Sequence, residues 1–549
     1  MADTVPEAPQ PIWSSDLVQR LSAMASARPG LVSALLGIVV ACGFPPFHAW
    51  WIALPALAAF VAHVYLAPNW RAAMWRGWLF GWAHLTLANN WIATAFTHQA
   101  KMPEVLGWVA VPMLCIYLAI YPALAALLAH LLARRTGALS FAAVLAASWI
   151  ATEWIRSWAF TGYPWPPLGL MLLGGWERPG LASTLPYLGT YALSGAAVFI
   201  AGSLFWLMKS QRWWLAGAQV VLIAAGMMIP GIVITSPNDG VRYTLVQPLI
   251  PQSEINDGTK FEEQFQRIAD LTRPGNDTSR VILWPESAIP DYLEEGYPDR
   301  YYRATTYAAN PALARERIGS VIGDQSTLLT GVVNLDIGTR SDGLVGALTA
   351  RNSVIALNGD GEITRHYAKA HLVPYGEYLP LEDWLGALGL ARLTAGTVPY
   401  DPGPGPRTLD LGEHGRAGIQ ICYEIVFSGQ VVDRNDRPDY IFNPSNDGWF
   451  GAWGPPQHLA QARMRAIEEG LPVLRSTTTG ISAVIDANGV VRQSIASEVA
   501  GKVDGIVPRA KPPTLFARMG NALPLAWAAL LAAIGLGLPR LLALRSKHS

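Results

Sequence analysis

The chain has 549 residues, of which 51% are hydrophobic and 15% are charged. Soluble domains have about a quarter of their residues charged, so this composition excludes a wholly soluble enzyme. The 40 basic and 40 acidic residues give no formal net charge, and nothing in that balance points to nucleic-acid binding.

Eight apolar segments are each long enough to approach the ~20 residues that a helix needs to span a bilayer. They lie near residues 30–46, 49–67, 76–97, 107–133, 138–159, 186–208, 213–235 and 517–541. The first contains Cys-Gly-Phe-Pro-Pro at 42–46, so it is predicted either to cross the membrane or to form a bent or re-entrant helix. We expect a helical membrane domain of about eight transmembrane helices.

Basic residues lie before the first apolar segment, after the second, fourth and sixth, and at the end of the chain. They are Arg20, Arg28, Arg71, Arg76, Arg134, Arg135, Lys209, Arg212, Arg540, Arg545 and Lys547. The positive-inside rule places these positions in the cytoplasm. The pattern therefore predicts cytoplasmic N- and C-termini, and it places the polar region after the seventh segment on the opposite side of the membrane.

The polar region between the seventh and eighth segments alternates between predicted strands and helices. The expected strands are 243–246, 281–284, 327–333, 352–357, 418–422, 440–443 and 483–485, and the expected helices are 260–272, 312–322 and 457–469. Such alternation indicates an α/β domain. We therefore divide the chain into membrane helices at 1–234, an α/β domain at 235–513, and a last membrane helix with a basic tail at 514–549.

Three short motifs in the α/β region supply a carboxylate, an ammonium and a thiol. They are Trp-Pro-Glu-Ser with Glu286, Tyr-Ala-Lys-Ala-His with Lys369, and Ile-Cys-Tyr-Glu with Cys422. A thiol nucleophile needs a base to take its proton and a positive charge to stabilise the oxyanion. A lone cysteine is more often a small buried side chain, and the neighbouring motifs favour the catalytic alternative.

The order and content of these motifs resemble the nitrilase superfamily, and within it the apolipoprotein N-acyltransferase family of the bacterial inner membrane. Further stretches carry the resemblance: Leu-Val-Gln-Pro-Leu-Ile-Pro-Gln at 245–252, Asn-Asp-Gly-Trp-Phe-Gly at 446–451, Gln-His-Leu-Ala-Gln-Ala-Arg-Met-Arg-Ala-Ile-Glu at 457–468, Glu-Trp-Ile-Arg-Ser-Trp at 153–158 and Thr-Gly-Tyr-Pro-Trp at 161–165. One departure is Ser253-Glu254, where relatives often have Lys-Trp.

The resemblance implies a four-layer α-β-β-α domain on the periplasmic face of a multi-pass inner-membrane protein. It also implies a two-step reaction in which Cys422 takes an acyl chain from a phospholipid, expected to be phosphatidylethanolamine, and passes it to the N-terminal amine of a diacylated apolipoprotein. Glu286 is the expected base, and Lys369 stabilises the oxyanion together with the backbone N–H of Tyr423. No cofactor and no metal are expected, and the protein is expected to be a monomer.

Several other residues are expected near the reaction. Glu377 resembles the second glutamate of nitrilase-type sites and is predicted either to orient Lys369 or to shift the local charge balance. Asn352 is a candidate for hydrogen bonding behind the triad. Tyr423 and Glu424 follow the nucleophile and are expected either to line the site or to brace it. Capping a turn is an equally weighted alternative for Glu424.

A hydrophobic substrate predicts an apolar rim at the mouth of the site. The candidates for a lipid-facing lid are Trp384, Leu385, Leu388 and Leu390, extended by Trp449 and Phe450. An ordinary buried helix is the alternative for 384–390.

Charged pairs are predicted at two further places. Glu153 and Arg156 lie one helical turn apart within the fifth apolar segment, where charges pair or serve function, and an interfacial pair supporting the domain contact is favoured over binding of a lipid headgroup. Arg463, Arg465 and Glu468 have helical spacing and are expected to form a structural ion-pair face.

Two other functions remain open on the sequence. A membrane-tethered amidase or nitrilase would use the same triad with water in the second step. A membrane scaffold or transporter with a nitrilase-like appendage would be expected to have a degenerate triad, whereas this triad is complete.

Overall fold

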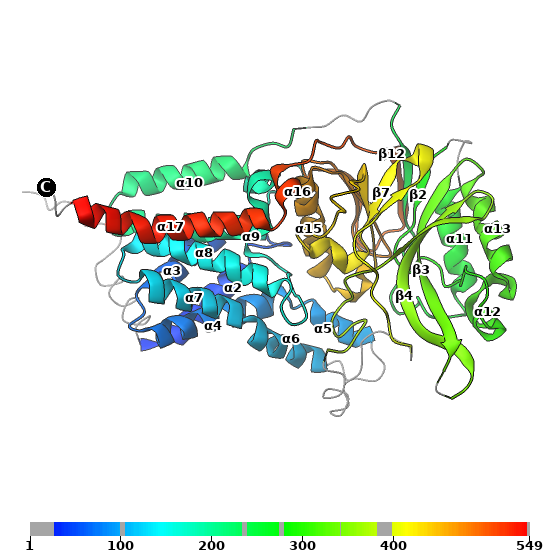
Figure 1. The fold of residues 1–549 in the computed structure, drawn as a ribbon, viewed down its shortest axis with the longest axis horizontal. Helices are drawn as coiled ribbons and strands as arrows, with labels where there is room; N and C mark the ends of the chain where they lie inside the picture. The colour runs from blue at the N-terminus through cyan, green and yellow to red at the C-terminus, as the bar shows by residue number, and fades with distance from the viewer. Residues whose placement is uncertain are drawn as a thin grey trace, which may run out of the picture.

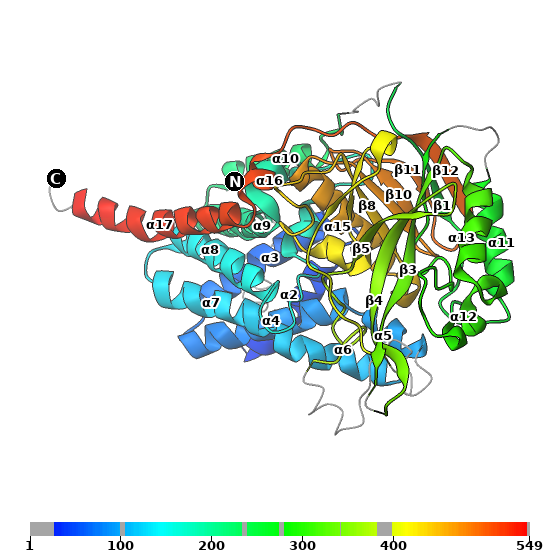
Figure 2. The same ribbon diagram turned by 45° about the vertical axis from the view of Figure 1, so that its right-hand side comes forward.

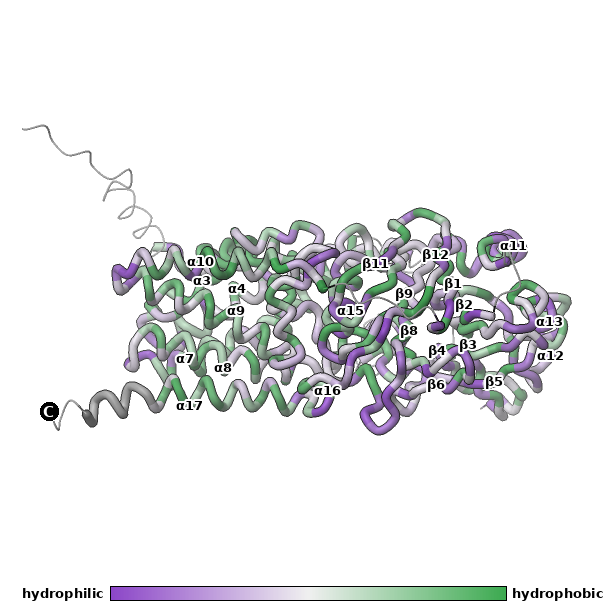
Figure 3. The backbone as a smooth tube through the Cα atoms, turned by 90° about the horizontal axis from the view of Figure 1, so that it is seen from above, coloured by the Kyte–Doolittle hydropathy of each residue, from purple (hydrophilic) through white to green (hydrophobic). Residues whose placement is uncertain are grey.

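The computed structural model describes residues 27–98, 105–232, 239–273, 279–340, 342–380 and 398–545, with side chains up to residue 537. The chain forms an elongated molecule with a helical bundle at one end and a sheet-rich part at the other (Figure 1). Apolar residues predominate along the bundle, and polar residues increase toward the sheets (Figure 3).

Each of the eight predicted apolar segments is helical. The bundle helices are α2 (Pro29–Ala41), α3 (Trp50–Tyr65), α4 (Trp70–Ala88), α6 (Val105–Leu118), α7 (Ile120–Ala133), α8 (Ala138–Arg156), α9 (Leu185–Lys209), α10 (Trp213–Met227) and α17 (Ala522–Arg545). The fourth apolar segment contains both α6 and α7, and the short helix α5 (Ile92–Ala95) follows α4.

The bundle helices differ in length and in how apolar they are. Within the described residues, three stretches are long and apolar enough to cross a membrane: 105–133, 138–156 and 181–209. Four shorter helices are also apolar: α2, α3, α10 and the part of α17 at 522–537. These findings support a membrane region.

The first apolar segment is broken where its sequence predicted. Helix α2 ends at Ala41, and the chain turns through residues 42–47 before α3 begins at Trp50. Proline at 45 and 46 explains the end of the helix, because proline lacks the N–H group that a continuing helix needs.

Twelve strands form two six-stranded sheets. The first sheet has the order β12-β1-β2-β3-β4-β5 and the second the order β11-β10-β9-β8-β7-β6. The strands are β1 (Arg242–Gln247), β2 (Val281–Leu283), β3 (Thr327–Thr339), β4 (Val345–Asn358), β5 (Ile363–Ala368), β6 (Thr408–Asp410), β7 (Arg416–Ile419), β8 (Tyr440–Ser445), β9 (Val473–Thr477), β10 (Ser482–Ile485), β11 (Val491–Ile495) and β12 (Gly501–Ile506).

Helices cover the outer faces of both sheets. On the first sheet lie α11 (Phe261–Thr272), α12 (Asp299–Thr305) and α13 (Pro311–Ile322), while α15 (Gly454–Glu469) lies between the second sheet and the bundle (Figures 1 and 2). This is the predicted four-layer α-β-β-α nitrilase-like fold. The short helix α16 (Leu515–Met519) leads from the sheets back to α17.

Helix α15 is buried on both sides. Proline in its first turn and Gly470 in the left-handed conformation after its last turn fit the usual helix ends. Ala460 and Met464 pack into the core of the bundle, and Leu459 and Ala462 pack into the core of the sheets. One helix therefore belongs to both hydrophobic cores.

Candidate active site

The three predicted catalytic residues follow three different strands. Glu286 lies just after β2 and Lys369 directly after β5. Cys422 was expected at the end of a strand over 418–422, but β7 ends at Ile419 and Cys422 begins the 3₁₀ helix η6 (Cys422–Val426). Strand ends and the turns that follow them present side chains from a rigid scaffold. Here they bring together residues up to 136 positions apart.

Lys369 is held between two carboxylates, and its side chain is 1% exposed. Its Nζ atom lies 2.9 Å from Glu377 Oε1 and 3.6 Å from Glu286 Oε1. Burial alone would lower the pKa of Lys369, but the carboxylates of Glu377 and Glu286 outweigh it and raise that pKa above its ordinary value. Lys369 is therefore a fixed positive charge.

Asn352 and Asn446 hold the Glu286 carboxylate from two sides. The Asn352 Nδ2 group donates to Glu286 Oε1 at 2.7 Å and to Glu377 Oε1 at 2.9 Å. The backbone N–H of Asn446 donates to Glu286 Oε2 at 2.8 Å. Asn352, predicted only as a supporting residue, thus connects both glutamates, whereas the contribution of Asn446 comes from its backbone.

Cys422 has a left-handed backbone with φ of +51°, which is uncommon for a residue other than glycine. Burial raises the pKa of its thiol well above the usual value, and the Glu286 carboxylate raises it further. The Lys369 ammonium and a hydrogen bond from the Asn446 backbone N–H act in the opposite direction. The side chain is therefore a thiol at rest and needs a base when it attacks.

Glu424 connects the turn after Cys422 to the segment that contains Lys369. Its Oε2 accepts from the backbone N–H of Ile421 at 2.8 Å, and its Oε1 accepts from that of Ala370 at 2.7 Å. The Tyr367 hydroxyl donates to the same carboxylate at 2.9 Å. The geometry is that of a brace, and it includes a contact with the Ile421 backbone N–H that caps the start of η6.

Tyr423 points from the nucleophile turn to the helical bundle. Its hydroxyl donates to the carbonyl of Gly162 at 3.2 Å, and its ring lies 6.5 Å from that of Tyr163. The residue next to Cys422 therefore contacts the loop after α8. The site faces the bundle rather than bulk solvent at this point.

The predicted lipid-facing role of Phe450 is wrong. Phe450 is buried, with its ring 4.7 Å from Trp91 and 5.8 Å from Trp165, so it fills the contact between the bundle and the sheets. Trp449 is half-buried and its ring lies 5.7 Å from His98. The remaining lid candidates, Trp384, Leu385, Leu388 and Leu390, lie outside the described residues.

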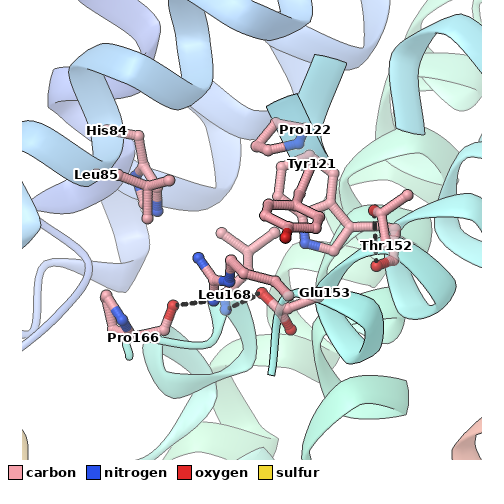
Figure 4. A pocket seen from close by; sticks show the side chains of 10 residues that line it. His84, Leu85, Tyr121, Pro122, Thr152, Glu153, Pro166 and Leu168 are labelled. Atoms are coloured by element: carbon pink, nitrogen blue, oxygen red, sulfur yellow. Dashed lines mark hydrogen bonds and ion pairs between the residues drawn. The ribbon is translucent and has the colours of Figure 1, made fainter. Parts of the chain in front are cut away.

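Glu153 and Arg156 support the loop that follows α8. Both are buried, with Arg156 Nη2 3.7 Å from Glu153 Oε1. Arg156 donates to the carbonyl of Pro166 at 2.9 Å, and Glu153 accepts from the backbone N–H of Leu168 at 2.9 Å. These contacts line a small cavity between α4, α7 and α8 (Figure 4). The pair lies inside the bundle, behind the loop that contacts the other domain.

The predicted ion-pair face on α15 is correct in part. Arg465 Nε and Glu468 Oε2 lie 2.7 Å apart and are buried. Arg463 instead donates to backbone carbonyls, including those of Gly174 at 2.9 Å and Gly489 at 2.7 Å. Burial lowers the pKa of Arg463 to about 9, and the Asp486 carboxylate opposes this.

Several residues of the site were not singled out from the sequence. They are Asn446, Asp447, Gln457, His458 and Arg475, all buried. Gln457 accepts from Trp165 Nε1 at 2.8 Å and donates to the carbonyls of Pro45 and Ala88. Most of these residues lie in the motif stretches that carried the family resemblance, which was the available signal.

Two family models match the chain, one in each of its two parts. The model described as the apolipoprotein N-acyltransferase N-terminal domain matches residues 36–203, and the model described as carbon-nitrogen hydrolase matches residues 245–500. Among solved structures, an amidase from Nesterenkonia sp. covers 52% of this chain and 96% of its own, at 16% identity and a TM-score of 0.30.

Two curated relatives match over most of their length. The apolipoprotein N-acyltransferase of Rhodopseudomonas palustris is 32% identical over 520 residues, covering 89% of this chain and 91% of the relative. That of Bradyrhizobium diazoefficiens is 36% identical over 447 residues, covering 76% and 77%. The family predicted from the motifs is thereby confirmed, and the chain belongs to the apolipoprotein N-acyltransferases, membrane-associated acyltransferases that N-acylate lipoproteins with a nitrilase-like domain.

Proposed function

We propose that Cys422 carries the acyl group as a thioester, that Glu286 is the general base, and that Lys369 stabilises the oxyanion. The observation that supports this most strongly is the buried Lys369 ammonium, 3.6 Å from Glu286 Oε1 and close enough to Cys422 to lower the pKa of its thiol. Glu377 and Asn352 keep these charges in place.

In the first step, the Cys422 sulfur attacks the sn-1 ester carbonyl of a phospholipid. Glu286 takes the thiol proton as the C–S bond forms, and the oxyanion lies against Lys369 and the backbone N–H of Tyr423. Tyr423 is in the first turn of η6, where backbone N–H groups have no partner within the helix. The ester C–O bond then breaks. The leaving alkoxide takes the proton from Glu286, which releases a lysophospholipid and regenerates the carboxylate.

In the second step, the free amine of the S-diacylglyceryl cysteine attacks the thioester. Glu286 takes a proton from the amine as the C–N bond forms, and Lys369 again faces the oxyanion. The C–S bond breaks, and the proton on Glu286 returns to the Cys422 sulfur. The product is a triacylated lipoprotein, and each step leaves the site as it began.

We propose phosphatidylethanolamine as the acyl donor, and a donor from the bilayer is supported by the position of the nucleophile. Tyr423, the next residue, donates to the Gly162 carbonyl in the bundle. A lipid that enters from the membrane would reach Cys422 along this side of the domain.

We also propose eight membrane crossings, with the catalytic domain in the periplasm and both termini in the cytoplasm. The carbonyls of Pro45, after α2, and Ala88, at the end of α4, accept from Gln457. Thr190, near the start of α9, contacts Glu468. This is the alternation that eight crossings require, and α17 ends far from the sheets (Figure 1), with Arg540 and Arg545 in its last turns.

A labelled donor tests this function. The enzyme in detergent is mixed with phosphatidylethanolamine deuterated in the sn-1 chain and with a synthetic S-diacylglyceryl-cysteine peptide. Mass spectrometry should find one labelled acyl group on the peptide amine, and none on a control peptide whose amine is acetylated. Release of labelled free fatty acid with no peptide product would instead indicate a hydrolase.

A further inference from the structure

Helix α15 places a buried histidine against the backbone of the nucleophile. His458 Nε2 lies 3.0 Å from the carbonyl oxygen of Cys422, and the His458 side chain is 0% exposed. A carbonyl oxygen can only accept a hydrogen bond, so this contact requires a hydrogen on Nε2. His458 is the donor.

The other side of the imidazole is fixed by a buried ion pair. His458 Nδ1 lies 3.0 Å from Asp447 Oδ1 and 3.0 Å from Arg475 Nη2, and Arg475 Nη2 lies 2.7 Å from both Asp447 oxygens. Burial, and secondarily Arg475, lower the pKa of His458. In the neutral ring with hydrogen on Nε2, Nε2 donates to the Cys422 carbonyl and Nδ1 accepts from Arg475.

The residue that receives this hydrogen bond has an unusual backbone. Cys422 has φ of +51°, and such conformations persist where surrounding contacts determine them. The direction of the Cys422 carbonyl sets the orientation of the peptide plane between Cys422 and Tyr423, and it constrains the backbone that carries Sγ. An imidazole held by the buried Arg475–Asp447 ion pair is suited to hold that orientation.

We propose that His458 is a positioning residue, which fixes the nucleophile Cys422 by donating from Nε2 to its backbone carbonyl. The proposal rests on the proposed role of Cys422 as the acyl carrier. His458 touches neither substrate nor the reacting atoms in this account, and it acts through the Cys422 backbone alone.

The segment that contains Asn446 and Asp447 also positions the base. Asn446 donates its backbone N–H to Glu286 Oε2 at 2.8 Å, and the next residue, Asp447, accepts from Arg475, which donates to His458 Nδ1. The base and the nucleophile are therefore held by neighbouring residues of one segment. On its other side the His458 ring lies 5.0 Å from Trp165 of the loop after α8, which connects the network to the bundle.

Two substitutions separate hydrogen bonding from packing. His458→Gln keeps an amide donor near the Nε2 position but removes the ring, whereas His458→Phe keeps a ring beside Trp165 and Phe450 but removes the donor. The measurement is the rate of alkylation of Cys422 by iodoacetamide, followed on the peptide that contains it, together with the rate of thioester formation from phosphatidylethanolamine. Thermal unfolding reports folding separately.

The matched control is His414→Phe. His414 is a buried histidine at the opposite end of β7 from Cys422, with Nε2 3.0 Å from Ser279 Oγ. This variant is expected to keep both rates close to those of the unmodified enzyme. It measures how much the loss of a buried imidazole lowers the two rates when that imidazole does not contact Cys422.

We expect His458→Gln to keep both rates within about threefold, and His458→Phe to lower both by about 10- to 100-fold, the range for a misplaced reacting group. Equal losses in both variants, or a larger loss in His458→Gln, would overturn the proposal. If His458→Phe does not fold, His458→Asn replaces it, because its shorter amide reaches the Nδ1 position and leaves the carbonyl without a donor.

The outcome is separable from a failure of the proposed function. If the unmodified enzyme forms no thioester on Cys422, the role of Cys422 is wrong, and with it the basis for assigning His458 to positioning. If the thioester forms and the two His458 variants behave alike, only the positioning role is wrong.

Discussion

Glu468 accepts a hydrogen bond from the backbone N–H of Thr190 at 2.6 Å, so that a carboxylate on α15 caps a helix of the bundle. Helix α9 is interrupted at Gly189, where φ is +73°, and Thr190 therefore begins its regular part. Arg465 pairs with Glu468 and also donates to the Val426 carbonyl at the end of η6. Helix α9 and the nucleophile turn are thus bound to the same two side chains.

Substitution of Glu468 by alanine should destabilise the whole molecule. The change leaves the Arg465 guanidinium, 1% exposed, without its carboxylate, and removal of one partner of a buried pair costs about 3–5 kcal/mol. We expect a lower free energy of unfolding in detergent and slower acyl transfer. Glu468→Gln, which keeps an oxygen for Thr190, should lose less, and equal stability of Glu468→Ala and the unmodified enzyme would contradict this account.

Asn352→Asp should inhibit the first step without changing the size of the side chain. The Asn352 Nδ2 group donates to both Glu286 and Glu377, and an aspartate would bring a third carboxylate to the same place. We expect thioester formation to fall by about 100-fold at pH 7 and by less at pH 5, because crowded carboxylates bind a shared proton. Asn352→Ala removes the donor without adding charge, so an equal loss in both variants at every pH would exclude the electrostatic explanation.

Glu424→Gln should weaken the brace between Lys369 and Cys422. Burial raises the pKa of Glu424 to about 7, although hydrogen bonds from Ile421, Ala370 and Tyr367 oppose the shift. A glutamine would turn its NH₂ group toward one of these donors, at a cost of about 1–3 kcal/mol. Unfolding midpoints and thioester formation should both fall, whereas Glu316→Gln, at an exposed site, should change neither.

Glu469 should make stability depend on pH. Burial, and then the neighbouring Glu468, raise the pKa of Glu469 from 4.5 to about 7. The folded protein therefore binds this proton more tightly than the unfolded chain, and stability decreases as the pH rises from 4.5 to about 7. A shift of this size corresponds to about 3 kcal/mol. Relative to the unmodified enzyme, Glu469→Gln should gain stability across that range, and parallel curves of unfolding midpoint against pH would count against it.

The sequence pointed to the proposed reacting groups because their chemistry is carried by side chains. Glu286, Lys369 and Cys422 have few other uses in this order, and strand ends bring such residues together. Glu377 was predicted near the reaction from its resemblance to the second glutamate of nitrilase-type sites, and Asn352 as a candidate for hydrogen bonding behind the triad. The alternation of apolar strands and amphipathic helices predicted an α/β domain, and the resemblance to the nitrilase superfamily implied its two-sheet, four-layer form.

Other features depend on contacts that no local pattern contains. Phe450 is a large apolar residue of the kind expected in a lipid-facing rim. Its contacts with Trp91 and Trp165, which are distant in the sequence, bury it instead. Asn446 contributes a backbone N–H, and the identity of its side chain gives no indication of that contact. Strands such as β5 and β12 were missed because they alternate polar and apolar residues weakly at the edges of a sheet.

The central claim is a covalent acyl group on Cys422, and intact-protein mass spectrometry tests it most directly. The unmodified enzyme and Cys422→Ala, which keeps Cys42 and Cys115, are each incubated with phosphatidylethanolamine and no acceptor. We predict one hydroxylamine-sensitive acyl adduct on the unmodified enzyme, discharged by a diacylated lipopeptide and absent from Cys422→Ala. An adduct that persists in Cys422→Ala, or lipopeptide acylation by that variant, would contradict the account.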